Sequence, residues 1–128
     1  MRVRFAELEP ILRELFATQR YAVLGTLGAE RVTLNLMALA VTDDLRSLVL
    51  ATERATAKYA NLKSNPQVAL LVDNRSNQAV DTQMALALTI DGLAEEAQGA
   101  ERDRLAACLL ARHPQLGPFI SSPGCALF

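Results

Sequence analysis

The chain has 128 residues, a formal net charge of −1, 51% hydrophobic residues and 21% charged residues. This length predicts a single domain, residues 1–128, that buries roughly two thirds of its unfolded surface. The interspersed charges exclude the basic face that a nucleic-acid-binding protein needs. No apolar run has the length of a membrane span, and the N-terminus lacks the apolar core of a signal peptide. We therefore expect a cytoplasmic protein that contacts neither nucleic acid nor membrane.

Cys108, Cys125 and the single histidine, His113, limit the metal and nucleophilic chemistry that is open to the chain. A zinc site needs more ligands than these residues can group. We expect reduced thiols in a cytoplasmic protein, with a disulfide as the alternative. Cys108 falls on the apolar face of a predicted helix and should be a small core residue. His113 precedes Pro114 at a predicted helix end, which favours a capping or surface role over catalysis.

The remaining elements follow from apolar periodicity and turn residues. Helices are predicted from about residue 7 to 18, because Pro10 is tolerated only in a first turn, and over residues 56–64 and 99–112. Five strands and the start of a sixth are predicted over residues 21–27, 32–41, 47–51, 67–72, 82–94 and 125–128. Mostly hairpin connections favour a mainly β protein, a small barrel with flanking helices, over a doubly wound sheet. The chain has no Rossmann or P-loop motif.

The segment from residue 47 to 74 is the most informative part of the sequence. It reads as a strand, a loop with Thr52 and Thr56, a helix and a second strand. Lys58 stands in the first helical turn, where a cation is mildly unfavourable because a helix N-terminus is already positive. Free N–H groups, a threonine hydroxyl and an ammonium group together form a phosphate site. The alternative is that Lys58 is an ordinary solvated lysine.

Two further positions leave a structural and a functional interpretation open. Asn35 is the one polar side chain in the middle of its predicted strand, so it is either a buried amide bonded to backbone or a contact to a ligand. The strand over residues 82–94 has one face of small and polar residues, which must meet solvent, a partner subunit or a ligand.

The order of elements, together with the segment LATERATAKYANLKSNPQVALLVDNRSNQ, resembles the FMN-binding split β-barrels related to pyridoxamine 5′-phosphate oxidase. The resemblance extends from about residue 21 to 128, and its most specific part is Thr52, Thr56, Lys58 and residues 60–77. The tail over residues 110–128 is similar to one branch of the family. The resemblance implies a six-stranded antiparallel split barrel of Greek-key type, which forms a homodimer with FMN at the subunit interface.

The resemblance also implies roles for individual residues. Thr52, Thr56 and Lys58 would hold the flavin phosphate and ribityl chain, and Ala51 would lie beneath the ribityl chain. The second strand would border the isoalloxazine ring through Leu34, Asn35 and Leu36. Two residues, Arg75 and Asn77, would reach the site from the partner subunit.

Three departures from the family pattern argue against oxidation of pyridoxamine phosphate itself. Ala57 stands where the oxidase has an arginine, so one bidentate phosphate contact is lost. The basic residue of the oxidase's second strand has no counterpart here. Relatives usually continue past the final CALF, so we expect the last strand of the barrel to be shortened.

The leading hypothesis is an FMN-dependent oxidoreductase whose small-molecule substrate or electron donor the sequence does not name. The flavin would carry the redox chemistry, and we assign no protein group as acid or base. The alternatives are a non-catalytic module that binds FMN as an electron carrier, a deazaflavin or haem, and a dimeric domain with a degenerate site.

Overall fold

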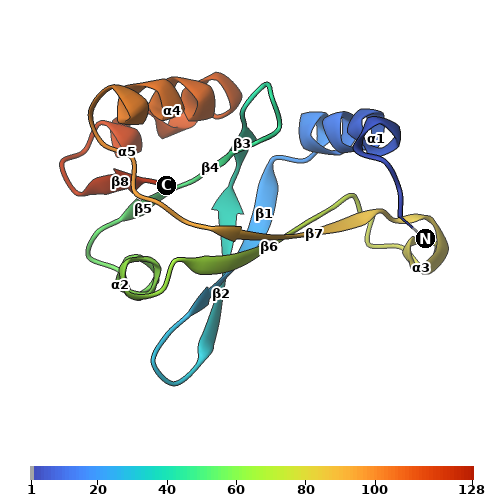
Figure 1. The fold of residues 1–128 in the computed structure, drawn as a ribbon, viewed down its shortest axis with the longest axis horizontal. Helices are drawn as coiled ribbons and strands as arrows, with labels where there is room; N and C mark the ends of the chain where they lie inside the picture. The colour runs from blue at the N-terminus through green and yellow to red at the C-terminus, as the bar shows by residue number, and fades with distance from the viewer. Residues whose placement is uncertain (1) are drawn as a thin grey trace.

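The computed structural model describes residues 2–128 and is built around a four-stranded antiparallel sheet (Figure 1). The strand order is β2-β1-β6-β7, with bounds Val32–Ala38, Tyr21–Leu27, Gln67–Asp73 and Ala87–Leu93. The β1–β2 hairpin pairs along its whole length, from Tyr21 opposite Ala38 to Leu27 opposite Val32. The apolar pattern therefore predicted the bounds of β1 correctly, and it predicted the hairpin.

Two small antiparallel sheets continue the fold beside the main one. They pair β3 (Ala40–Val41) with β4 (Leu48–Val49), and β5 (Ala51–Glu53) with β8 (Cys125–Leu127). Leu50 and Phe128 extend the second pair by exchanging two backbone hydrogen bonds of 2.9 Å. The fold is thus an antiparallel sheet with flanking helices. The expectation of six strands in one barrel is corrected, because the main sheet has four strands and the barrel is not closed.

The strand expected over residues 32–41 is interrupted at Leu39. The N–H of Leu39 donates to the carbonyl of Arg20 at 3.0 Å and completes the β1–β2 ladder. The carbonyl of Leu39 instead lies 2.9 Å from Nε2 of His113, at the end of a distant helix. The chain leaves the main sheet at this point and enters β3. His113 is fully buried, so the expected surface position was wrong, although its backbone does cap that helix.

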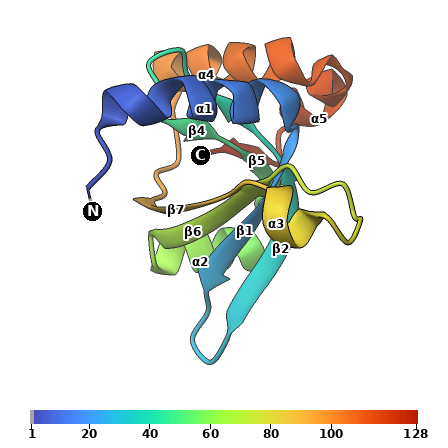
Figure 2. The same ribbon diagram turned by 90° about the vertical axis from the view of Figure 1, so that its right-hand side faces the viewer.

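Helices α1 (Phe5–Thr18) and α4 (Gly99–Arg112) lie along the same side of the molecule, and the tip of the β1–β2 hairpin projects from the other side (Figure 2). The start of α1 differs from the expected residue 7, and Pro10 lies inside the helix. One half of a capping box supports this earlier start, because the Arg4 N–H donates to the Glu7 carboxylate at 3.3 Å. Short helical turns follow α4, namely η1 (Pro114–Leu116) and α5 (Gly117–Ile120).

The strand expected over residues 82–94 is wrong in its first part, where the chain forms the short helix α3 (Asp81–Met84). The carboxylate of Asp81 accepts hydrogen bonds from the backbone N–H groups of Ser76, Asn77 and Gln78, and from the Ser76 hydroxyl. These local bonds outweigh the alternating pattern. The strand β7 therefore begins only at Ala87.

Three apolar clusters hold these layers together. The first lies between α1 and one face of the main sheet, and the second lies between α4 and the small sheets. The third cluster joins helix α2 (Ala57–Ser64) to β8 and consists of Leu62, Ala126 and Phe128. Helix α2 is thus packed against the end of the chain. No helix among residues 2–128 is long and apolar enough to cross a membrane.

We expect Leu109→Ala to lower the free energy of unfolding by about 2–5 kcal/mol, because Leu109 is 0% exposed inside the second cluster. Urea titration monitored by circular dichroism measures this change. Met84→Ala is the matched control, because Met84 is 71% exposed and its truncation should have little effect. Equal losses in the two variants would contradict the assigned core.

Candidate functional site

Two threonine hydroxyls meet at the start of α2. Thr52 lies on β5 and is only 3% exposed, and its Oγ1 is 3.4 Å from Oγ1 of Thr56. Thr56 is the N-cap of α2: its hydroxyl accepts the N–H of Tyr59 at 3.2 Å and donates to the carbonyl of Glu53 at 2.8 Å. The sequence placed both threonines in one site, and the structure brings them together.

The first turn of α2 is electrostatically suited to an anion. It contains Lys58, and it contains no acidic residue. The amides of Ala57 and Lys58 belong to the part of a helix that has no intrahelical acceptor. Among the carboxylates of residues 2–128, none pairs with Lys58, whereas Lys63 in the last turn pairs with Glu96 at 3.5 Å. The free amides and Lys58 of this first turn are groups that can bind a phosphate, whereas the Thr56 hydroxyl proton is already donated to the Glu53 carbonyl.

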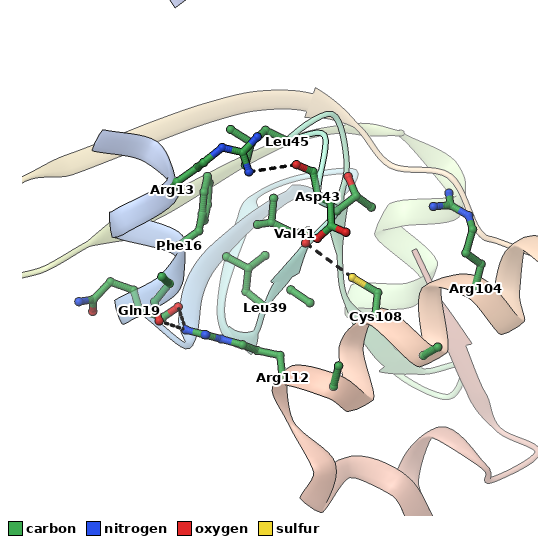
Figure 3. Close-up of a pocket in the computed structure, with 15 residues that line it drawn as sticks. Arg13, Phe16, Gln19, Leu39, Val41, Asp43, Leu45, Arg104, Cys108 and Arg112 are labelled. Atoms are coloured by element: carbon green, nitrogen blue, oxygen red, sulfur yellow. Dashed lines mark hydrogen bonds between the residues drawn. The ribbon is translucent and has the colours of Figure 1, made fainter. Parts of the chain in front are cut away.

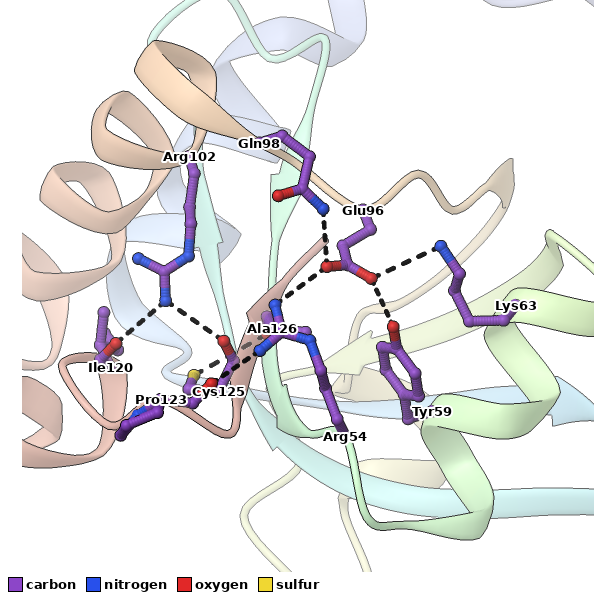
Figure 4. Close-up of polar contacts among 10 residues, drawn as sticks. All are labelled: Arg54, Tyr59, Lys63, Glu96, Gln98, Arg102, Ile120, Pro123, Cys125 and Ala126. Carbon is purple, nitrogen blue, oxygen red and sulfur yellow. Dashed lines mark hydrogen bonds and ion pairs between the residues drawn. The ribbon is translucent and has the colours of Figure 1, made fainter.

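A buried carboxylate holds α2 in place (Figure 4). The Glu96 side chain, from the segment between β7 and α4, is only 5% exposed. Its oxygens accept hydrogen bonds from the Tyr59 hydroxyl at 2.7 Å, from Arg54 at 3.0 Å and from Gln98 at 2.9 Å. The Tyr59 bond is the largest cause, followed by Arg54, of a Glu96 pKa of about 2, against an ordinary 4.5. Glu96 was not among the predicted site residues, because nothing in its local sequence pattern marks it.

The predicted ring-binding residues of β2 do not share one face. Leu34 and Leu36 lie on the exposed face of the sheet and are 68% and 72% exposed. Asn35 pairs opposite the buried Leu24 and faces the core side. Its Oδ1 is buried and has no hydrogen-bond partner among the described residues. Helix α2 packs on this same side, because Asn61 donates to the buried Thr26 hydroxyl on β1 at 3.2 Å.

Ala51, Arg75 and Asn77 have different relations to the threonine pair. Ala51 is half-buried on β5, directly before Thr52. Arg75 and Asn77 follow the far end of β6, whereas α2 lies before its start (Figure 1). A seven-residue strand is about 20 Å long, so one chain does not bring these two residues to the threonines. Arg75 pairs with Asp73 at 2.9 Å, and Asn77 has a positive φ of 62° in the loop held by Asp81.

A separate groove of about 630 Å³ lies between α1 and α4 (Figure 3). Its arginines are occupied by the protein: Arg13 donates to the Asp43 carbonyl at 3.0 Å, and Arg112 donates to the Ala17 carbonyl at 2.7 Å. These bonds fasten α1 to its neighbours. Cys108 is half-buried in the groove wall, and burial raises the pKa of its thiol. We therefore assign this groove no ligand.

Residues 2–128 contain no group of three histidine, cysteine, aspartate or glutamate side chains that could hold a metal ion. The imidazole of His113 is committed to Leu39, and its Nδ1 is buried without a hydrogen-bond partner in the described part of the chain. The threonine pair and the start of α2 thus remain the candidate site.

The family model for pyridoxamine 5′-phosphate oxidase matches residues 8–119. Because this match covers most of its length, the chain belongs to the pyridoxamine 5′-phosphate oxidase family. No curated protein matches it significantly.

Several solved structures have a similar fold. A heme binding protein from Mycobacterium smegmatis has a TM-score of 0.81 and 20% identity over 99% of this chain and 50% of its own length. The heme storage protein HutZ from Vibrio cholerae has a TM-score of 0.73 and 18% identity over 94% of this chain and 86% of its own. General Stress Protein 26 from Bacillus anthracis str. Sterne has a TM-score of 0.69 and 18% identity over 94% and 85%. The chain spans about half the length of the Mycobacterium protein. At these identities the similarity establishes the fold alone.

We expect Glu96→Gln to lower the free energy of unfolding at pH 7 by on the order of 2 kcal/mol. The folded pKa of Glu96, about 2, lies below its ordinary 4.5. The carboxylate's stabilisation is therefore complete above about pH 4.5 and is lost as the pH falls toward 2. Urea titrations at pH 7, 5 and 3 should show a shallower loss of stability in the variant than in the wild type.

Glu101→Gln is the control for this titration series. Glu101 forms an exposed pair with Arg104, and such pairs contribute little to stability. Parallel pH profiles for the wild type and Glu96→Gln would contradict the role of Glu96.

Proposed function

We propose that the chain binds FMN at the start of α2 and acts as an FMN-dependent oxidoreductase on a small-molecule substrate or electron donor. The observation that carries this proposal is the pair of threonine hydroxyls beside the first turn of α2. Thr52, Thr56 and Lys58 would hold the phosphate, with Ala51 beneath the ribityl chain. FMN, when bound, supplies the hydride or electron chemistry, and the protein binds and orients it.

The second strand would contribute the surroundings of the ring. Asn35 has a buried amide oxygen without a protein donor, which suits an N–H group of a ligand. Leu34 and Leu36 point away from Asn35. They would therefore border either the ring bound by their own chain or the ring bound by the partner subunit. Arg75 and Asn77 would reach the cofactor of the partner subunit, which agrees with their separation from the threonines in one chain.

Haem is the alternative cofactor, because two of the similar structures are named as haem proteins. Histidine is a common axial ligand of haem iron. The only histidine of this chain, His113, is 0% exposed, and its Nε2 is bonded to a backbone carbonyl. Iron ligation by His113 would break that bond and require the end of α4 to open. This cost favours FMN.

The first test is an absorption spectrum of the purified protein after incubation with FMN and gel filtration, with a parallel incubation with haemin. We expect flavin bands near one FMN per chain and no Soret band. A protein that retains haemin but no flavin would overturn the FMN proposal in favour of haem. A protein that retains neither would indicate a degenerate site.

We expect Lys58→Ala to weaken FMN binding roughly tenfold or more, because a charge-assisted contact to phosphate is lost. Riboflavin, which lacks the phosphate, should bind both proteins equally. Quenching of flavin fluorescence measures both affinities. Lys63→Ala is the matched control, since it removes the same charge from the other end of α2. Unchanged FMN affinity in Lys58→Ala would reject the assigned role.

The exposed face of the main sheet supports the homodimer in this proposal. Six of its large apolar side chains are exposed, and strand pairing places them on the same face of the sheet as Gly25 and Ala69. They are Leu27 at 37%, Val32 at 62%, Leu34 at 68%, Leu36 at 72%, Leu71 at 36% and Leu93 at 71% exposure. A contiguous apolar face of this kind is typical of a protein–protein interface. The partner would be a second copy of the chain, with the cofactor at the border between them.

We expect Ala69→Arg to convert the dimer into a monomer, because it places a charge at the centre of this face. Asp91 lies directly opposite Ala69 and can pair with the new arginine, so the fold should be kept. Sedimentation velocity measures the oligomeric state. Ala100→Arg, on the exposed start of α4, is the control and should stay dimeric. A dimer that survives Ala69→Arg would place the interface elsewhere.

A further inference from the structure

The segment that carries the proposed phosphate site contains a second cation that does not serve it. Arg54 is two residues from Thr52 and two residues from Thr56. Its guanidinium donates to Glu96 at 3.0 Å and to the carbonyl of Pro123 at 2.9 Å (Figure 4). The side chain therefore points toward the segment before α4 and the segment before β8, instead of toward the threonines.

One carboxylate binds two of the three cations on this segment. Glu96 pairs with Arg54 at 3.0 Å and with Lys63 at 3.5 Å, and Lys58 alone pairs with no carboxylate of residues 2–128. The Tyr59 hydroxyl and Gln98 also bind Glu96, so the carboxylate is fixed from several directions. The Glu96 side chain is 5% exposed and that of Arg54 is 37% exposed, so the pair is partly shielded from water on the carboxylate side.

We propose that Glu96 is a specificity-determining residue that keeps Arg54 out of the anion site and so limits the site to one side-chain cation, Lys58. The inference rests on the proposed function, because it concerns the site that would hold the FMN phosphate. The position directly before Lys58 is Ala57, so it adds no cation to the site. The pairing with Glu96 means that the nearby Arg54 adds none either. Glu96 touches no cofactor itself and acts only through Arg54.

The proposed role and a purely structural role of Glu96 predict opposite effects of its removal on phosphate binding. If Glu96 only supported α2, its removal would loosen the helix start and weaken phosphate binding. If Glu96 sequesters Arg54, its neutral replacement removes the ion pair and leaves the guanidinium held only by the Pro123 carbonyl and a neutral amide oxygen. A phosphate can compete with these neutral acceptors, because a guanidinium binds it through two parallel charge-assisted hydrogen bonds. Glu96→Gln should then strengthen the binding of any ligand that presents a phosphate.

The test compares FMN with riboflavin in the full-length protein, by fluorescence quenching at pH 7. We expect Glu96→Gln to bind FMN roughly tenfold more tightly than the wild type, with unchanged affinity for riboflavin. The gain should diminish as salt is raised, because it arises from one added charge. The double variant Arg54→Gln/Glu96→Gln should return to the wild-type affinity. Unchanged or weaker FMN binding by a folded Glu96→Gln protein would overturn the proposal.

A single variant keeps the proposal testable if Glu96→Gln does not fold. Arg54→Gln in the wild-type background should leave FMN affinity unchanged, because Arg54 does not reach the phosphate there. Tyr59→Phe removes one bond to Glu96 without changing any charge, and it should not strengthen FMN binding. Weaker FMN binding in Arg54→Gln, with riboflavin binding unchanged, would show that Arg54 already serves the site and would overturn the proposal.

If the proposed function is wrong, the wild type binds neither FMN nor riboflavin, and this result distinguishes its failure from failure of the role of Glu96. Inorganic phosphate is then the probe, and the rise in melting temperature that it causes is the readout. A phosphate-dependent rise in Glu96→Gln that both the wild type and the double variant lack would still support the role of Glu96. No such rise would overturn it.

Discussion

The buried carboxylate of Glu96 is the contact on which the arrangement around α2 depends. Burial of an unpaired charge is costly, so a carboxylate at this depth needs donors that satisfy both oxygens. Those donors come from α2, from the loop before it and from the segment before α4. The apolar contact of Leu62 with Ala126 and Phe128 acts on the same helix. Together they fix α2 against the end of the chain, and the start of α2 carries the paired threonines.

The sequence predicted elements well where periodicity and packing agree. The bounds of β1 and α4 were correct because each has a regular apolar pattern that is buried as the pattern requires. The errors lie where a polar contact from elsewhere decides the backbone. His113, which is 74 residues away in the sequence, is hydrogen-bonded to the carbonyl of Leu39, and the strand that the local pattern would continue ends there. The Asp81 carboxylate accepts hydrogen bonds from backbone N–H groups of the preceding loop, and a helical turn begins at Asp81 where the alternating pattern predicted a strand.

The candidate site shows the same division between local and distant contacts. Thr52, Thr56 and Lys58 lie within seven residues, so a strand, a loop and a helix start were sufficient to predict their proximity. The contact between Tyr59 and Glu96 spans 37 residues and has no signature in either segment. Strand alternation places Asn35 on the face of β2 opposite Leu34 and Leu36, so the assignment of all three to the surroundings of a ring stays a prediction that needs both faces or the strand backbone.

The charges at the start of α2 are consistent with a phosphate monoester as the ligand. Such a group carries about −1.5 to −2 charges at neutral pH. A helix N-terminus contributes roughly half a positive charge, and Lys58 adds one, so the two together offset most of the phosphate charge. A free guanidinium would add a further positive charge and would strengthen the binding of phosphate ligands, most of all those with more negative charge, such as diphosphates. On this argument, the pairing of Arg54 with Glu96 and the alanine at position 57 act in the same direction, because both keep the positive charge of the site low.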